Sequence, residues 1–387
     1  MTNKQKTTIL FIHHGKGIGG APLSLLYLVQ ALDQRFFKPV VLFLHDSDAL
    51  KMYRELGIET VGPVNRMDFP HTKIWWLRWY HAPMIFRAIK DTLITRFFTA
   101  PHWLKKIKPD MVHLNTSSLV AWAIAAHRAK IPVIWHIREP LANGYFGLRK
   151  AFVRTCVARY ATRIVAISKH DAQPWIKNPK VHIMYNAVPP EKFNPTTDPS
   201  VFLKRYNLDP STPKILFLGG VSREKGTYLI CNIFTELLKK LPNAQLLIAG
   251  ASNTFKPPSN ATLLGTIHDT PAAMAASNVI VFPATVGHFA RPIIEAGFMK
   301  KPVVASNLAP LDELVIHNKT GFLIDHKDTQ AWVDALYKLL TNSTLNHSMG
   351  KQAYAFCTEH FGLDKQQQII HELYLETLEK NYEPRNT

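Results

Sequence analysis

The sequence predicts an α/β protein built from two doubly wound, Rossmann-like units. At 387 residues, the chain is longer than the about 250–300 residues at which a single hydrophobic core stops growing. Short β-rich apolar runs alternate with helical patterns, as in parallel sheets covered on both faces. This alternation occurs twice, and the segment Asn186–Pro213 between the halves is rich in proline and turn residues.

The first half carries six predicted strands and is expected to form one domain over residues 1–190. The strands are Thr8–His13, Pro39–His45, Met111–Asn115, Val133–Ile137, Ile164–Ser168 and Val181–Asn186. The helices predicted between them include Ala21–Leu32, Ser118–Arg128 and Leu148–Tyr160.

The second half repeats the arrangement over residues 191–365. Its predicted strands are Lys214–Leu218, Gln245–Ala249, Ala261–Leu264, Val279–Pro283, Pro302–Ala305 and Gly321–Ile324. Four-residue apolar steps predict a helix over Gly226–Leu241. A last helix, Asp364–Lys380, places Ile370, Tyr374 and Leu378 on one face. We expect the segment 366–387 to pack back towards the first domain.

Composition indicates a globular protein of a reducing compartment. Apolar residues make up 47% and charged residues 19%. Cys156, Cys231 and Cys357 are far apart, without metal-type spacing, which favours free thiols. The N-terminal apolar run resembles a strand more than a signal peptide, and no run reaches about 18 apolar residues. A cytoplasmic protein without a membrane span is therefore expected.

A formal charge of +18 favours anionic partners, with nucleic acid and an anionic membrane surface as candidates. The positive excess lies in the first half, where the segment His71–Lys108 interleaves aromatic and basic residues and Pro140–His170 is rich in Lys and Arg. Such a segment is typical of a membrane interface or acceptor-binding surface. Its candidate residues are Trp75, Trp76, Arg78, Trp79, Arg87, Lys90, Arg96, Lys105 and Lys106. The alternatives are core helices with solvated cations, and nucleic-acid binding by stacking.

Two glycine-rich loops follow predicted first strands, where a parallel sheet binds phosphate. The first, HHGKGIGG, contains Gly19 and Gly20 but lacks dinucleotide spacing, so a turn without a ligand is an equal alternative. The second, LGGVSREKG, places two glycines before two cations that could face a diphosphate. These residues are Gly219, Gly220, Arg223 and Lys225.

The run VFPATVGHFARPIIEAGFMKKPVVASNLAPLDELVIHNKTGFLID resembles the donor-binding core of the retaining glycosyltransferases of group 1, which include glycogen-synthase-like and mannosyltransferase enzymes. Members typically read F-P-S, Glu-x7-Glu, G-x-P-V-V-A, an acid near E-L-V, and T-G-x-L. HHGKGIGGAPLSL, VHIMYNAVPPEKFNP and LGGVSREKG extend the resemblance over most of the chain. It implies the GT-B fold, in which two Rossmann-like domains face a central cleft, and a nucleotide-sugar donor.

The resemblance also implies roles for individual residues. Glu295 would accept hydrogen bonds from the ribose hydroxyls, and Lys225 would balance the diphosphate of the leaving group. His136, in the strand PVIWHIREP, would contact a donor-sugar hydroxyl or the acceptor, although a structural strand histidine is an even alternative. The backbone amides implied at the diphosphate are those of Phe289, Ala290 and Arg291.

Two positions depart from the family pattern. Gly287 stands where the first Glu of the pair is expected, and Gly220 replaces an arginine at the diphosphate. His288 could take over a sugar hydroxyl, and Arg223 or Arg291 could restore the positive charge. Altered donor specificity or reduced activity are the alternatives.

The predicted function is retaining transfer of a hexosyl group from a nucleotide sugar to a glycan or lipid-linked glycan at the cytoplasmic membrane face, as in polysaccharide or glycolipid assembly. Front-face displacement is implied by the family. No metal and no nucleic-acid partner are expected. A nucleotide-binding relative without transferase activity, and a nucleotide-sugar epimerase or hydrolase on the same fold, are the alternatives.

Overall fold

A computed structural model describes residues 6–15, 17–66, 82–250 and 255–382. The chain divides into two compact units. Met1–Ala187 and Leu363–Thr387 form the first unit, and Val188–Gly362 forms the second.

The first unit contains a parallel sheet of seven strands in the order β3-β2-β1-β4-β5-β6-β7. Its strands are β1 Thr7–His13, β2 Phe37–Phe43, β3 Thr60–Val61, β4 Met111–Leu114, β5 Val133–Ile137, β6 Arg163–Ala166 and β7 Val181–Ile183. Its α-helices are α1 Gly20–Ala31, α2 Asp48–Glu55, α3 Ala82–Ile94, α4 Ala100–Ile107, α5 Val120–Arg128, α6 Leu148–Tyr160, α7 Lys169–Ala172 and α14 Leu363–Tyr382. A π-helical turn, Thr95–Thr99, joins α3 to α4, and 3-10 turns cover Tyr145–Gly147 and Gln173–Trp175.

Both faces of this sheet are buried, which explains the continuous apolar strands. In β1, Leu10 and Ile12 join the core formed with α4, α5 and α6, whereas Ile9 and Phe11 join the core formed with α1, α2 and α14. The two-residue alternation of the strand therefore supplies both cores.

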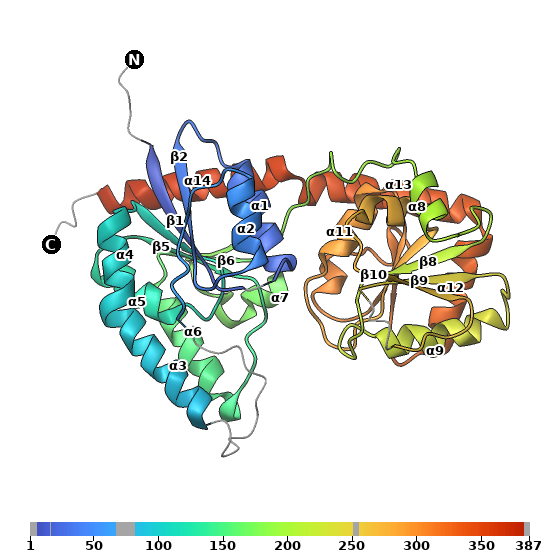
Figure 1. The fold of residues 1–387 in the computed structure, drawn as a ribbon, viewed down its shortest axis with the longest axis horizontal. Coiled ribbons are helices and arrows are strands. Elements are labelled where there is room, and N and C mark those ends of the chain that lie inside the picture. The colour runs from blue at the N-terminus through green and yellow to red at the C-terminus, as the bar shows by residue number, and fades with distance from the viewer. Residues whose placement is uncertain (1–5, 16, 67–81, 251–254, 383–387) are drawn as a thin grey trace. The chain divides into compact units, whose positions relative to one another are not determined.

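The C-terminal helix α14 belongs to the first unit, as the sequence predicted. Ile370, Leu373 and Tyr374 are buried in the core that contains α1 and α2, and Gln366 donates a hydrogen bond to the backbone oxygen of Tyr185 (3.1 Å). Figure 1 shows α14 beside α1, with which it packs.

The second unit contains a parallel sheet of six strands in the order β10-β9-β8-β11-β12-β13. Its strands are β8 Lys214–Phe217, β9 Gln245–Ala249, β10 Ala261–Gly265, β11 Val279–Phe282, β12 Val303–Ser306 and β13 Gly321–Ile324. Its helices are α8 Ser200–Arg205, α9 Thr227–Leu238, α10 Thr270–Ala275, α11 Arg291–Phe298, α12 Thr329–Thr341 and α13 Ser343–Phe361, with a 3-10 turn at Leu311–Glu313.

Each sheet has one point at which the order of its strands reverses. This switch point lies between β1 and β4 in the first unit and between β8 and β11 in the second. In doubly wound sheets, ligands bind at the carboxyl ends of the strands that flank the switch point. The loops after these four strands are therefore where a site is expected.

Candidate active site

The loop after β8 is held in a fixed path by its glycines and by Thr227. A Cβ atom on Gly219 would lie 2.0 Å from the Phe217 ring, and Gly220 has a φ of +66°. The Thr227 hydroxyl donates to the Gly220 carbonyl (2.7 Å) and accepts from the Ser222 backbone amide (2.9 Å). The loop therefore folds back onto the start of α9.

The loop after β11 is bonded to the loop after β8. The Thr285 hydroxyl donates to the Arg223 carbonyl (3.0 Å), and the Thr285 amide donates to the Glu224 carbonyl (2.9 Å). Gly226 lies directly against the loop after β11: a Cβ atom on Gly226 would be 1.7 Å from the Pro283 carbonyl oxygen. The exposed Arg223 and Lys225 are thus held beside the loop 283–290 at the switch point.

The N-terminus of α11 faces the end of that loop. Ala290 occupies the N-cap position and is buried, with no side-chain cap on the first amides of the helix. Uncapped amides and the helix dipole favour an anion at such a position. The structure therefore gathers the predicted amides of Phe289, Ala290 and Arg291 on the same edge as Lys225.

Glu295 lies one turn into α11 and is 5% exposed, so it is not a surface helix residue. Its Oε1 accepts a hydrogen bond from Arg291 Nε (2.7 Å). Arg291 is therefore engaged by this carboxylate, whereas the guanidinium of Arg223 lies 5.4 Å from the centre of the Tyr228 ring.

The substitution at Gly287 has a steric cause. A Cβ atom at this position would lie 1.9 Å from the Ala309 carbonyl oxygen, in the loop after β12. The neighbouring His288 donates through Nδ1 to the Val286 carbonyl (2.9 Å) and lies 5.2 Å from the Phe282 ring, centre to centre. A glutamate at position 287 does not fit this backbone path. The loss of the family's first Glu therefore depends on the loop after β12 as well as on the loop after β11.

We therefore expect Gly287→Glu to destabilise the protein by about 1–3 kcal/mol or more, as overpacking against backbone does. Gly287→Ala adds only the Cβ atom and should lower the melting temperature to a similar extent. Gly17→Glu is the control, because a Cβ atom on Gly17 has no neighbour within 4 Å. Thermal unfolding of the three variants is the measurement. A Gly287→Glu protein of wild-type stability would show that the loop accepts the family residue.

In the first unit, four polar residues meet at the carboxyl ends of the strands. Arg138 donates through Nε to the side-chain oxygen of Asn115, and through Nη1 to that of Asn186 (2.5 Å). Asn115 Nδ2 in turn lies 3.1 Å from His13 Nδ1. These residues follow or end β1, β4, β5 and β7. The sequence signal for this cluster was a polar residue directly at the end of each strand.

Glu139 is fixed beside this cluster. Its Oε1 accepts hydrogen bonds from the Thr116 hydroxyl (2.8 Å) and from the Ser117 hydroxyl (2.6 Å) and amide (2.8 Å). The loop after β4 is thereby tied to the loop after β5.

His136, predicted either as a contact to the donor sugar or acceptor or as a structural strand histidine, lies inside the first unit. Its ring is fully buried, because β5 is covered on both faces. His136 Nδ1 lies 3.1 Å from His113 Nε2, and His113 Nδ1 lies 2.6 Å from the Tyr374 hydroxyl. Burial lowers the pKa of both histidines well below the usual value, so both are neutral.

Gly19 and Gly20 lie at the start of α1, where Gly19 is the N-cap residue. Both are exposed, and a Cβ atom on either would meet nothing within 4 Å. Packing within the protein therefore does not require glycine at positions 19 and 20. Close approach of a ligand to the backbone is a reason for glycine at these positions.

Part of the described basic aromatic segment is exposed, whereas Leu104 is buried and Trp103 packs against the core of the first unit, as the core alternative predicts. Phe86, Ile89, Leu93 and Phe97 form an outward stripe along α3 and the turn that follows it, and Phe86 is 73% exposed. The cations beside the stripe are Arg87, Lys90, Arg96, Lys105 and Lys106. Trp75, Trp76, Arg78 and Trp79 lie outside the described residues.

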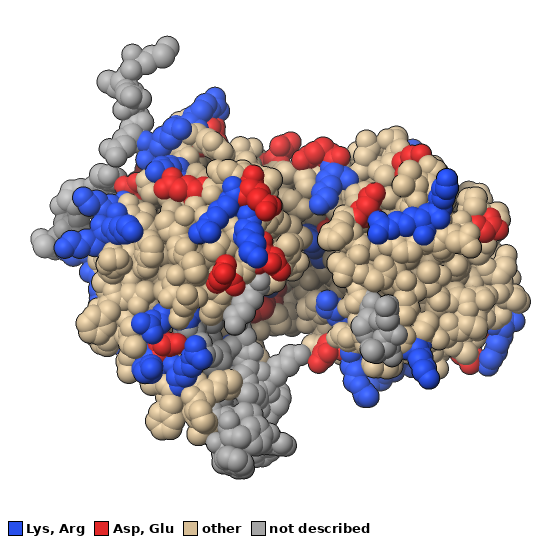
Figure 2. Space-filling view, in the orientation of Figure 1, with Lys and Arg blue, Asp and Glu red and all other residues tan. Residues whose placement is uncertain are grey.

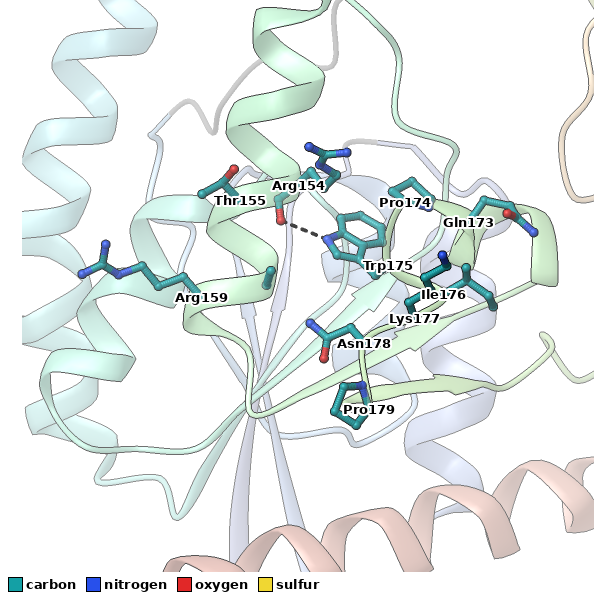
Figure 3. Close-up of a pocket in the computed structure, with 11 residues that line it drawn as sticks. Arg154, Thr155, Arg159, Gln173, Pro174, Trp175, Ile176, Lys177, Asn178 and Pro179 are labelled. Atoms are coloured by element: carbon teal, nitrogen blue, oxygen red, sulfur yellow. Dashed lines mark hydrogen bonds between the residues drawn. The ribbon is translucent and has the colours of Figure 1, made fainter.

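Two grooves of similar size lie away from the switch points. One, of about 810 Å³, is lined by α6 and by the turn that precedes β7 (Figure 3). The other, of about 840 Å³, lies between β13 and α12 of the second unit. Neither contains a residue of the loops described above.

Two Rossmann-like units are the architecture of the GT-B class of glycosyltransferases. The family described as "Glycosyl transferases group 1" matches residues 201–356, and "Glycosyltransferase Family 4" matches residues 18–192. The chain therefore belongs to the group 1 glycosyltransferases.

Among individual proteins, the chain is similar to a trehalose synthase of Thermococcus litoralis, with 25% identity over 62% of the chain and 64% of that enzyme. It therefore spans a little less than two thirds of that relative's length. It is 23% identical to the UDP-Gal:alpha-D-GlcNAc-diphosphoundecaprenol alpha-1,3-galactosyltransferase of Escherichia coli, over 70% of the chain and 77% of that enzyme.

Among solved structures, HepE from Anabaena, in complex with UDP, superposes with a TM-score of 0.77 at 20% identity, over 96% of this chain and all of that one. Sucrose-phosphate synthase from Thermosynechococcus elongatus superposes with a TM-score of 0.72 at 16% identity, over 97% of this chain and all of that one. These likenesses show the fold.

Proposed function

We propose that the protein transfers a hexosyl group, with retention of configuration, from a nucleotide sugar to a hydroxyl of a glycan or lipid-linked glycan. The observation that carries this proposal is the convergence of Lys225, the uncapped start of α11 and the buried Glu295 at the switch point of the second unit. The name of the E. coli relative gives a diphosphate-linked lipid as its acceptor, which supports the lipid-linked acceptor.

In this mechanism the donor end of the site works by electrostatics. Glu295 accepts hydrogen bonds from the ribose hydroxyls, while Lys225, Arg223 and the α11 amides stabilise the diphosphate as it leaves. The acceptor hydroxyl attacks from the face that the diphosphate leaves, so the configuration is retained. These groups supply the positive charge, and we therefore expect no metal requirement. His136 remains a predicted contact to the sugar or acceptor.

A panel of UDP-, GDP- and dTDP-sugars tests this function. We expect one family of nucleotides to raise the melting temperature, and nucleotide release to require a lipid or glycan acceptor. Binding without release under any acceptor would instead support an inactive relative. Release of free sugar or an epimer without acceptor would support a hydrolase or epimerase and contradict the transferase.

We also propose that the first unit attaches to the anionic cytoplasmic face of a membrane. The apolar stripe Phe86–Phe97 with flanking cations has the composition of an interfacial helix. Figure 2 shows Lys and Arg side chains gathered over α3, beside an uncharged tip. The groove in Figure 3 adds Arg154, Arg159 and Lys177, and its lining contains no acidic residue. No described helix is long and apolar enough to cross a bilayer.

Flotation with vesicles that contain anionic lipid tests this attachment. The double variant Phe86→Asp/Ile89→Asp should reduce the floated fraction at least tenfold, because it removes buried apolar area and adds repulsion from the lipid. Val201→Asp, at an equally exposed apolar residue of the second unit, should float like the wild type. Equal flotation of the wild type on neutral vesicles, or none in low salt, would contradict the proposal.

A further inference from the structure

Arg138 carries a buried positive charge without a carboxylate partner. It is 9% exposed, and its two hydrogen-bond acceptors, Asn115 and Asn186, are neutral amides. Among the described residues, its Nη2 has no partner. The nearby Glu139 is occupied by the hydroxyls of Thr116 and Ser117. The charge of Glu139 favours the Arg138 cation from nearby, but among the described residues no carboxylate accepts a hydrogen bond from the guanidinium. Because a buried cation is costly, such an arrangement is expected where a ligand supplies further counter-charge.

His13 presents a second unpartnered donor. The side-chain oxygen of Asn115 accepts from Arg138, so the Asn115 amide nitrogen faces His13 and donates to its Nδ1. Burial lowers the pKa of His13 to about 3, so the ring is neutral and carries its proton on Nε2. His13 Nε2 is buried and has no partner in the described part of the chain.

His136 presents a third. The hydroxyl of Tyr374 donates to His113 Nδ1, which is the arrangement that leaves no buried hydroxyl proton unpaired. His113 Nε2 then donates to His136 Nδ1, and the proton of His136 lies on Nε2. That nitrogen is also buried without a partner among the described residues.

The three donors lie on one edge of the sheet. Ile12 pairs with Leu114, and Leu114 pairs with Trp135, so His13, Asn115 and His136 each stand one residue further along three adjacent strands. Arg138 follows two residues later, with the same side-chain alternation as His136. This is the carboxyl edge at the switch point of the first unit.

We propose that Arg138 and His13, with His136 beside them, bind a phosphate-type oxyanion of a substrate. This inference rests on the proposed function, since it names what the first unit recognises. The oxyanion is either the diphosphate of the donor or a phosphate of the acceptor. Gly15 belongs to the same site, because a Cβ atom there would lie 2.8 Å from His13 Nε2 and cover its donor edge.

Two binding arms test the proposal. The first compares UDP with uridine on the wild type, Arg138→Gln and the control Arg163→Gln by calorimetry; Arg163 is a half-buried arginine at the opposite end of β6. The second titrates inorganic phosphate into Lys225→Ala, which lacks the ammonium of the second unit, with and without Arg138→Gln. Gly15→Ala, which leaves Arg138 in place, is measured in both arms in case Arg138→Gln does not fold.

An at least tenfold loss of UDP affinity in Arg138→Gln, with uridine unchanged, would assign the oxyanion to the donor. Unchanged UDP affinity with at least tenfold weaker phosphate binding would assign it to the acceptor. Folded Arg138→Gln or Gly15→Ala proteins that bind both ligands like their parents would overturn the proposal. If the wild type binds GDP or dTDP and not UDP, that nucleotide and its nucleoside replace UDP and uridine in the first arm. If it binds none of the three, the donor assignment of the second unit fails, and the phosphate arm still tests the oxyanion site of the first unit.

Discussion

Glu295→Gln is expected to weaken nucleoside-diphosphate binding by about 10- to 100-fold, because hydrogen bonds to a charged group are worth about 1.5–3 kcal/mol. The change keeps the shape of the side chain and removes its charge. Turnover with the nucleotide sugar should fall at least as far, since the ribose contact orients the donor. Calorimetric titration with UDP and a nucleotide-release assay measure the two effects.

The ion pair with Arg291 requires a control, because Glu295→Gln also leaves that guanidinium without its carboxylate. The double variant Arg291→Met/Glu295→Gln removes both charges and should recover stability without recovering affinity. Glu236→Gln, on the exposed side of α9, should leave both unchanged. If the double variant binds UDP like the wild type, Glu295 serves the fold and not the ligand.

The first unit should lose stability as the pH falls from about 6.5 towards 3. His13, His113 and His136 have pKa values below the ordinary value because they are buried, and that of His13 is about 3. The unfolded chain therefore binds protons that the folded chain does not, and stability is full above about 6.5. At about 1.4 kcal/mol per pH unit, His13 costs about 2 kcal/mol by pH 5, and His113 and His136 add to the loss in the same direction.

Urea unfolding at pH 7.5 and at pH 5.0 measures this loss. His136→Gln should reduce the pH dependence, whatever it does to stability at pH 7.5, because one proton-binding site is removed from the unfolded chain. His347→Gln, at an exposed histidine of the second unit, should leave it unchanged. A stability that is flat between these pH values would show that the three rings take up protons while folded.

Much of the fold was predictable because strand periodicity is local. The predicted bounds of β5, β9 and β13 agree with the structure at both ends. The two-residue β3 was missed, since two residues show no periodicity. The strand predicted at Pro39–His45 instead begins at Phe37. Pro39 has no amide proton to donate towards β3, but β3 pairs only with Val41 and Leu42. No hydrogen bond to β3 is therefore lost at Pro39, and the strand can include it.

The residues predicted for the donor site of the second unit lie close together in the sequence. One loop contains Gly219, Gly220 and Lys225 within a few residues of one another. The start of α11 likewise contains Ala290, Arg291 and Glu295. Their spacing is therefore a property of the local chain, which a motif records. What the motif did not contain was the reason for Gly287, because the Ala309 carbonyl that excludes a side chain there comes from a different loop.

The sequence by itself determined two doubly wound units, their glycine loops and the buried carboxylate of α11. Only the tertiary structure decided the cluster of the first unit, because Asn115, Arg138 and Asn186 come from three separate strands. It also decided that His136 is buried, since which face of a strand is covered depends on helices far along the chain, among them α14. The carboxyl ends of parallel strands gather such residues at one edge, and no local pattern encodes that meeting.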